Sequence, residues 1–236
     1  MNGFILFIPL VIFSLDSAWK FSGSTTEQLE GEIINRVETT DKVVALTFDD
    51  GPTPGYAQRI LDVLEQEGVR ATFFLVGNAI EAWPEGARRI VEAGHEVGNH
   101  SYSHSRMILR DYDFVASELE RTEALIRAAG YTQPIHFRPP YGRKLFSLPR
   151  YLAERGMPSI TWDVAPETYG QDPQESQDII DGVLDSVRPG SIVLLHVMFE
   201  NRENTLAAVP DIIHGLRGKG YRFVTVSELL GYRDPG

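Results

Sequence analysis

Short apolar stretches alternate with longer segments of helical periodicity from residue 43 onward. The apolar stretches predict seven strands, at residues 43–48, 71–76, 95–100, 135–140, 159–164, 191–197 and 221–226. Between them apolar positions recur at helical spacing, as at Ile180, Val183, Leu184 and Val187. This alternation favours parallel strands joined by helical crossovers, arranged either as an open doubly wound sheet or as a closed, irregular βα barrel.

The N-terminal part of the chain has a different pattern. An apolar run at residues 4–15 is too short for a comfortable membrane span and has the length of a signal-peptide core. We therefore expect residues 1–20 to be a signal peptide or an N-terminal anchor, residues 21–40 to be an extension, and residues 41–236 to form one domain. The alternative is that the apolar run is a buried strand or helix of that domain. The first interpretation predicts an exported protein, located outside the cell, in the cell envelope or in the periplasm. It also predicts that any membrane association would involve this segment alone.

Charge and composition narrow the partners and the metal chemistry. The formal net charge is −11, so the surface would repel a phosphate backbone, and we expect no nucleic-acid partner. The chain has no cysteine, which excludes disulfides and thiolate ligands. Any metal site must therefore use histidine, aspartate or glutamate.

Charged or reactive side chains follow or end five of the seven predicted strands. In a parallel βα architecture these carboxyl ends lie on one face, which is where active sites assemble. In chain order the residues are Asp49 and Asp50, His100 and His104, Arg138, Trp162 and Asp163, and His196.

The spacing of two histidines indicates a metal site. His100 and His104 are four residues apart, so from a helical turn or a tight loop both imidazoles can reach one ion. One aspartate completes a set of two histidines and one carboxylate that leaves positions open for water and substrate, as catalytic sites do. The second aspartate can then serve as general base. The same ligand set also suits an Fe(II) oxygenase, although the spare aspartate and the distal histidine argue against it.

Four motifs resemble those of the polysaccharide deacetylases, carbohydrate esterase family four. They are TFDDGP (47–52), HSYSH (100–104), RPPYG (138–142) and LLH (194–196). The resemblance covers about residues 40–230 and implies a distorted, incomplete (β/α) barrel with about seven parallel strands. It implies that residues 41–236 are a catalytic domain, a metal-dependent hydrolase that removes N-acetyl groups from amino-sugar residues of a peptidoglycan- or chitin-like polysaccharide. An O-acetyl xylan or glycan esterase and a catalytically impaired glycan-binding homologue are the alternatives.

The resemblance also implies a role for each motif residue. Asp49 would be the catalytic base, held ionised by Arg138, and His196 would protonate the departing amine. Asp50 would bind the metal together with His100 and His104; we expect Zn²⁺, with Co²⁺ or Ni²⁺ as alternatives. The backbone N–H of Tyr141 would stabilise the oxyanion, and the substrate pocket would include Pro140, Trp162, Asp163, Tyr169 and Leu194.

The fourth motif departs from the family pattern. Ala165 and Tyr169 stand where the family has an aspartate and a tryptophan. That aspartate normally orients and charges the acid histidine. Asp163 and Glu167 are the two carboxylates nearby that could replace it.

Overall fold

A computed structural model describes residues 15–168 and 175–233 and has parallel strands at its centre. β2 (Val43–Asp49) pairs with β3 (Thr72–Leu75), β6 (Ser191–Leu195) and β7 (Arg222–Val224), and β3 pairs with β4 (Glu96–Asn99), all in parallel. All seven residues of β2 are buried. A strand covered on both faces is expected to be a continuous apolar run, as VVALTF is.

A second, smaller set of strands continues the ring. β1 (Ile33–Ile34) pairs in parallel with β5 (Ser159–Ile160). Phe137 forms single parallel bridges to Asn99 and to Ser159, so it connects β4 to β5, and Val164 forms another to Val193 on β6. The result is a distorted, incomplete barrel and not an open doubly wound sheet, which confirms the predicted fold class.

The predicted strand at residues 135–140 is wrong as a strand. Only Phe137 takes part in a strand pairing there. Pro134, Pro139 and Pro140 have no backbone N–H, so the segment cannot extend the ladder beyond this single bridge. The two-residue strand β1 was not predicted, because its short apolar pair lies in a polar segment.

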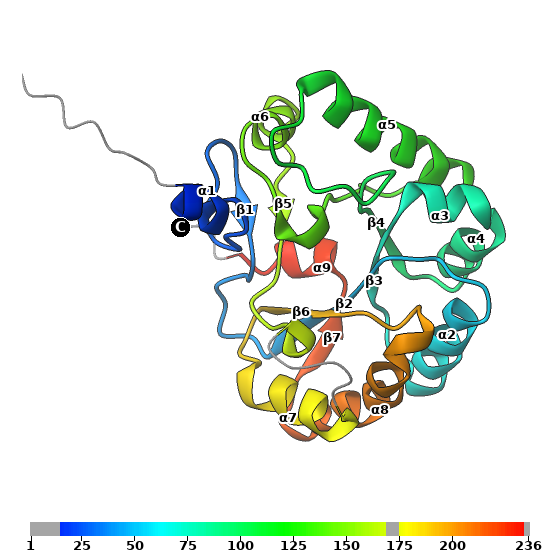
Figure 1. Ribbon diagram of the computed structural model, residues 1–236. Coiled ribbons are helices and arrows are strands. Elements are labelled where there is room, and N and C mark those ends of the chain that lie inside the picture. Colours follow the sequence, from blue (N-terminus) through cyan, green and yellow to red (C-terminus); the bar gives the residue numbers. More distant parts are fainter. Residues whose placement is uncertain (1–14, 169–174, 234–236) are drawn as a thin grey trace, which may run out of the picture.

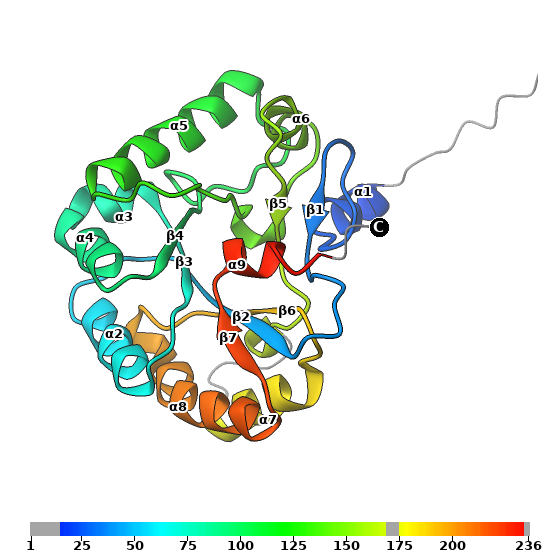
Figure 2. The same ribbon diagram turned by 180° about the vertical axis from the view of Figure 1, so that it is seen from behind.

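Helices surround the strands in both views of the molecule (Figures 1 and 2). The helical spacing at Ile180 and Val183 is confirmed, since both side chains are buried in one helix, α7 (Ser176–Ser186). The helices after the first are α2 (Tyr56–Glu67), α3 (Gly77–Ala82), α4 (Pro84–Glu92), α5 (Tyr112–Ala128), α6 (Ser147–Glu154), α7 (Ser176–Ser186), α8 (Glu203–Gly218) and α9 (Val226–Leu230).

The N-terminal segment lies along the outside of the barrel. It begins with α1 (Leu15–Ser22), and the Thr25 carbonyl accepts a hydrogen bond from Thr161 Oγ1 at 2.7 Å. Farther on, the Val37 N–H donates to the carbonyl of Gly190 at 3.0 Å. In the part of the chain that the structure describes, no helix has both the length and the apolarity needed to cross a bilayer. The apolar run at residues 4–15, apart from its last residue, lies outside the described residues.

Candidate active site

The carboxyl ends of the strands surround a cavity of about 580 Å³. The parallel pairing places these ends together, so residues from distant motifs meet there. The walls of this cavity are formed by Asp49, Asp50, His100, His104, Tyr141, Trp162, Leu194, His196, Phe199, Asn201 and Arg202.

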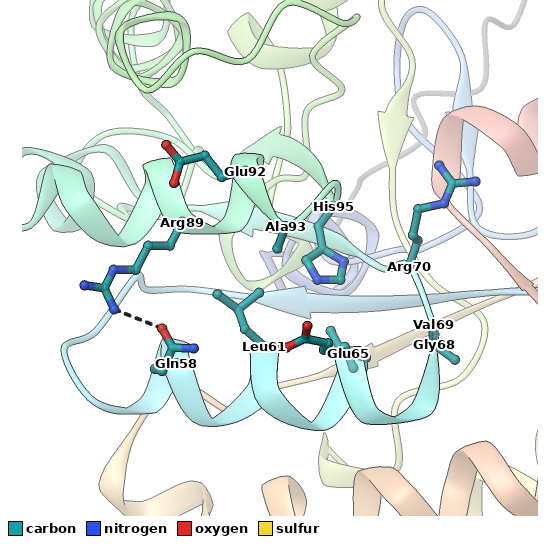
Figure 3. A pocket seen from close by; sticks show the side chains of 11 residues that line it. Gln58, Leu61, Glu65, Gly68, Val69, Arg70, Arg89, Glu92, Ala93 and His95 are labelled. Carbon is teal, nitrogen blue, oxygen red and sulfur yellow. Dashed lines mark hydrogen bonds between the residues drawn. The ribbon is translucent and has the colours of Figure 1, made fainter.

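A second cavity, of about 490 Å³, lies beside α2 and the α4–β4 turn (Figure 3). Its cationic groups already have partners: Arg89 donates to Gln58 Oε1 at 3.0 Å, and Arg70 is paired with Glu228. The Nδ1 atom of His95 accepts a hydrogen bond from the Ala71 N–H at 3.2 Å. This cavity contains no group of converging metal ligands among the described residues. The first cavity is therefore the candidate active site.

Three side chains in the first cavity form a group that could hold a metal ion. The ligand atoms of Asp50, His100 and His104 lie within 4.8 Å of one another. Asp50 Oδ1 is 3.1 Å from His104 Nε2 and 3.9 Å from His100 Nε2. His100 Nδ1 is 2.8 Å from the Arg138 carbonyl, to which it donates when Nε2 is the metal ligand. Burial, and then the charge of His100, lowers the pKa of His104, which favours the neutral imidazole that binds metals. The donor set and its spacing fit a divalent cation.

The two histidines are held by a tight loop and not by a helical turn. Ser101 and His104 have left-handed backbone conformations, with φ of 65° and 54°, and Asp50 has φ of 73°. Such conformations cost a non-glycine residue about 1 kcal/mol or more and cluster at functional sites. Local hydrogen bonds fix the loop: Asn99 Oδ1 accepts from the Ser101 N–H at 2.9 Å, and Ser101 Oγ accepts from the His104 N–H at 3.1 Å.

Asp49 and Arg138 form a buried ion pair next to the metal ligands. Arg138 Nη1 donates to Asp49 Oδ1 at 2.6 Å and to Thr47 Oγ1 at 2.8 Å, and Nη2 donates to the Thr161 carbonyl at 3.1 Å. Burial raises the pKa of Asp49, but the charge of Arg138 and the nearby imidazoles outweigh it and leave the pKa below its ordinary value. The second oxygen, Oδ2, lies 3.6 Å from His100 Nε2. Asp49 is thus an ionised carboxylate with one oxygen directed toward the candidate metal position.

His196 is paired with Glu167, one of the two carboxylates considered for the altered fourth motif. Its Nδ1 lies 2.6 Å from Glu167 Oε2, which also accepts from the His196 backbone N–H at 2.9 Å. Glu167 Oε1 accepts from Thr205 Oγ1 at 2.6 Å. Burial lowers the pKa of His196, but the hydrogen bond and charge of Glu167 outweigh it, so the pKa is raised above 6.5.

The other carboxylate, Asp163, has a different position from the one predicted. Its Oδ1 accepts from the Ile192 backbone N–H at 3.0 Å, and its Oδ2 accepts from Ser191 Oγ at 2.9 Å. Arg188 Nε lies 3.4 Å from the same Oδ2. Asp163 therefore anchors the amino-terminal end of β6 and does not line the cavity or contact His196. Residue composition could not separate the two carboxylates, because both lie within a few residues of Ala165.

The remaining pocket residues divide into three groups. Of the residues proposed for the substrate pocket, Tyr141, Trp162 and Leu194 line the cavity. Tyr141 lies in a short 3₁₀ turn (Pro140–Gly142), where its backbone N–H makes no hydrogen bond with any described residue, while Pro140 is buried behind it. The predicted Tyr169 lies outside the described residues. The prediction missed Phe199, Asn201 and Arg202, which line the cavity just after the LLH motif; proximity to that motif was the only available signal.

Comparisons with known proteins agree with this geometry. Residues 36–160 match the polysaccharide deacetylase family. The chain is 32% identical over 213 residues to a peptidoglycan-N-acetylglucosamine deacetylase of Bacillus cereus, covering 86% of this chain and 95% of that protein. A solved peptidoglycan N-acetylglucosamine deacetylase superposes with a TM-score of 0.78 at 32% identity, covering 83% of this chain and 91% of that one. A pseudoenzyme of carbohydrate esterase family four from Bacillus anthracis superposes with a TM-score of 0.77 at 30% identity, covering 87% of this chain and 71% of that one. The chain belongs to the polysaccharide deacetylase family.

Proposed function

We propose that the protein is an exported, metal-dependent hydrolase that removes N-acetyl groups from amino-sugar residues of a cell-wall polysaccharide. One observation carries this proposal: a metal-ligand group, an ionised buried carboxylate and a histidine–glutamate pair face one cavity. These are the parts that hydrolysis of an amide requires, namely a Lewis acid, a base and an acid. The similarity to peptidoglycan deacetylases supports the substrate class and a location outside the cytoplasm.

In this proposal Asp49 is the general base. Arg138 keeps it ionised and fixes its orientation, so the oxygen that faces the cavity accepts a proton from the attacking water. Asp50, His100 and His104 hold the metal ion, which we expect to be Zn²⁺ because all three ligands suit it and no thiolate is available. When bound, the metal polarises the acetamide carbonyl and lowers the pKa of water.

The other two steps fall to two further residues that line the cavity. The Tyr141 N–H, which has no acceptor among the described residues, donates to the oxyanion of the tetrahedral intermediate. His196, whose pKa is raised by the hydrogen bond and charge of Glu167 against the effect of burial, donates a proton to the departing amine. Leu194 supplies an apolar wall against the acetyl methyl group.

Two alternatives are tested by the same assay. An O-acetyl esterase would use the same groups on a different acyl bond. The other alternative is a glycan-binding protein without turnover, and the chain is similar to one pseudoenzyme of the family, from B. anthracis. Against that second alternative, the base, the metal ligands and a carboxylate-paired histidine are all in place.

The test is acetate release from N-acetylglucosamine oligomers, from peptidoglycan and from O-acetylated xylan. We expect the first two substrates to release acetate, a chelator to abolish release, and added Zn²⁺ or Co²⁺ to restore it. The variant His104→Ala should stay inactive after metal addition, whereas Arg222→Gln, at the opposite end of the barrel, should behave as wild type. Release from xylan alone would identify an esterase. If the metal-loaded protein released acetate from none of them, the hydrolase proposal would be abandoned.

A further inference from the structure

Two arginines occupy neighbouring positions next to Tyr141, a residue that lines the active-site cavity. Met107 and Lys144 form a parallel bridge, so the preceding residues, Arg106 and Arg143, occupy neighbouring positions on the two paired segments. Neither arginine forms an ion pair with a carboxylate of the described chain. This arrangement stands out in a protein that has 33 acidic and 22 basic side chains.

The partners of these arginines are neutral. The Arg106 guanidinium lies over the Tyr141 ring, 4.4 Å from its centroid. Arg143 lies over the Trp19 ring at 3.9 Å, and its Nη1 donates to Ser22 Oγ at 3.0 Å. Burial, and then the charge of Arg106, lowers the pKa of Arg143, which means that the two cations repel each other.

A third cation lies beneath them. Lys144 is buried, and its Nζ donates to two backbone carbonyls, those of Ser24 at 2.6 Å and Gly142 at 3.4 Å. Three basic side chains are therefore close neighbours, and no described carboxylate forms an ion pair with any of them. Like charges held this close are unfavourable unless solvent or an anion compensates them.

Tyr141 connects this group to the chemistry. Its ring lies 4.6 Å from the ring of the metal ligand His104, and it lines the cavity. Arg106 stacks on the Tyr141 ring, which occupies the face of its guanidinium and leaves the N–H groups at the edge to donate. The fork of a guanidinium matches a carboxylate in a bidentate hydrogen bond.

We propose that Arg106 and Arg143 form an anion-binding subsite that selects glycans carrying carboxylates near the acetamide that is hydrolysed. This inference rests on the proposed function, because it places the carboxylate on a sugar at or beside the one that reaches the metal. It favours an acidic glycan with lactyl or peptide carboxylates over a neutral chitin-like polymer as the substrate.

The test compares one glycan in two charge states. Glycan strands of alternating N-acetylglucosamine and N-acetylmuramic acid are used with their carboxylates free or converted to methyl amides. We expect wild-type kcat/KM to be roughly tenfold higher for the free acid, as expected for a charge-assisted hydrogen bond partly exposed to water. Added salt should bring the ratio of the two kcat/KM values closer to 1, because it screens the charges.

The variants locate the effect. Arg106→Gln should bring the ratio of kcat/KM for the free acid to kcat/KM for the methyl amide close to 1. Arg106→Lys should keep this ratio between 1 and the wild-type value, and Arg143→Gln should lower it below the wild-type value. The matched control is Arg222→Gln, at the other end of the barrel. It removes an exposed arginine that has no carboxylate partner among the described residues, and its ratio should equal that of wild type. Calorimetric binding of both glycans gives the same comparison without turnover.

The outcomes separate this inference from the proposed function. Equal binding and turnover of the two glycans by wild type would overturn the subsite, and so would an unchanged ratio in Arg106→Gln. Absence of acetate release from every glycan, with tighter binding of the free acid that Arg106→Gln abolishes, would reject the hydrolase and retain the subsite.

Discussion

Glu167 Oε2 lies 2.6 Å from His196 Nδ1 and also accepts the backbone N–H of the same histidine. One carboxylate oxygen thus fixes both the ring and the main chain of His196, and Thr205 binds the other oxygen. Ala165 stands where the family pattern has an aspartate, and a glutamate two residues later contacts the ring of the histidine that we propose as the acid. In the proposed mechanism Glu167 would be a positioning residue, because it would act on the substrate only through His196.

The pH profile of activity tests this pairing. His196 must be protonated to act as an acid, and Glu167 raises its pKa, so the alkaline decline of wild-type activity should lie at higher pH than an unpaired histidine would give. Glu167→Gln removes the charge that stabilises the imidazolium, so the alkaline limb of kcat/KM should move to lower pH and kcat should fall about 10- to 100-fold. The affinity for Zn²⁺, measured by chelator competition, should change little. An alkaline limb at the wild-type position would contradict the role of Glu167.

Asp163→Ala is the matched comparison, since this residue is the other carboxylate near Ala165. The substitution leaves the buried N–H of Ile192 without its acceptor, so the free energy of unfolding should fall by about 1–3 kcal/mol in urea denaturation. The alkaline limb should stay where it is in wild type. A shifted limb together with unchanged stability would assign to Asp163 the role that we give to Glu167.

The repeated pattern along the chain was sufficient to predict parallel strands joined by helices, with polar side chains gathered at their carboxyl ends. The choice of a distorted barrel over an open sheet came from the family motifs and not from that pattern. The apolar run before Asp49 must be buried on both faces, and parallel strands bring their carboxyl ends together wherever they are in the sequence. The choice between Asp163 and Glu167 depends on which way the chain turns after β5, and no pattern records that turn. Phe199 reaches the cavity through the irregular segment that follows β6, and Phe137 remains a single bridge because prolines flank it. Such details depend on tertiary packing and not on periodicity.

Single substitutions of the adjacent aspartates should separate metal binding from turnover. Asp50→Asn removes a ligand of the candidate metal site, so the affinity for Zn²⁺ should fall on the order of 100-fold or more. Asp49→Asn should bind Zn²⁺ within a few-fold of wild type and lose about 10²–10⁴ in kcat, which is the usual contribution of a general base. Metal affinity by calorimetry and acetate release are measured on the same samples. Equal loss of metal in both variants would contradict the division of roles.

Lys144 gives a prediction that is independent of the active-site chemistry. Its side chain is 1% exposed, and burial lowers its pKa to about 8. In the unfolded chain a lysine titrates near pH 10.4, so between about pH 8 and 10.4 the unfolded state binds more protons than the folded state. The free energy of unfolding of wild type should therefore rise through this window relative to Lys144→Met, by up to about 3 kcal/mol.

Urea denaturation of both proteins from pH 7 to 10.5 measures this difference directly. Lys144→Met keeps the apolar part of the side chain and removes the ammonium, so the comparison isolates the titration of a single buried group. Lys42→Met, which removes an exposed lysine, measures the effect of losing an exposed ammonium over the same range. A constant difference between wild type and Lys144→Met across the window would mean that the buried ammonium stays charged. In that case the carbonyls of Ser24 and Gly142 would compensate its desolvation fully, and they would be the groups to examine next.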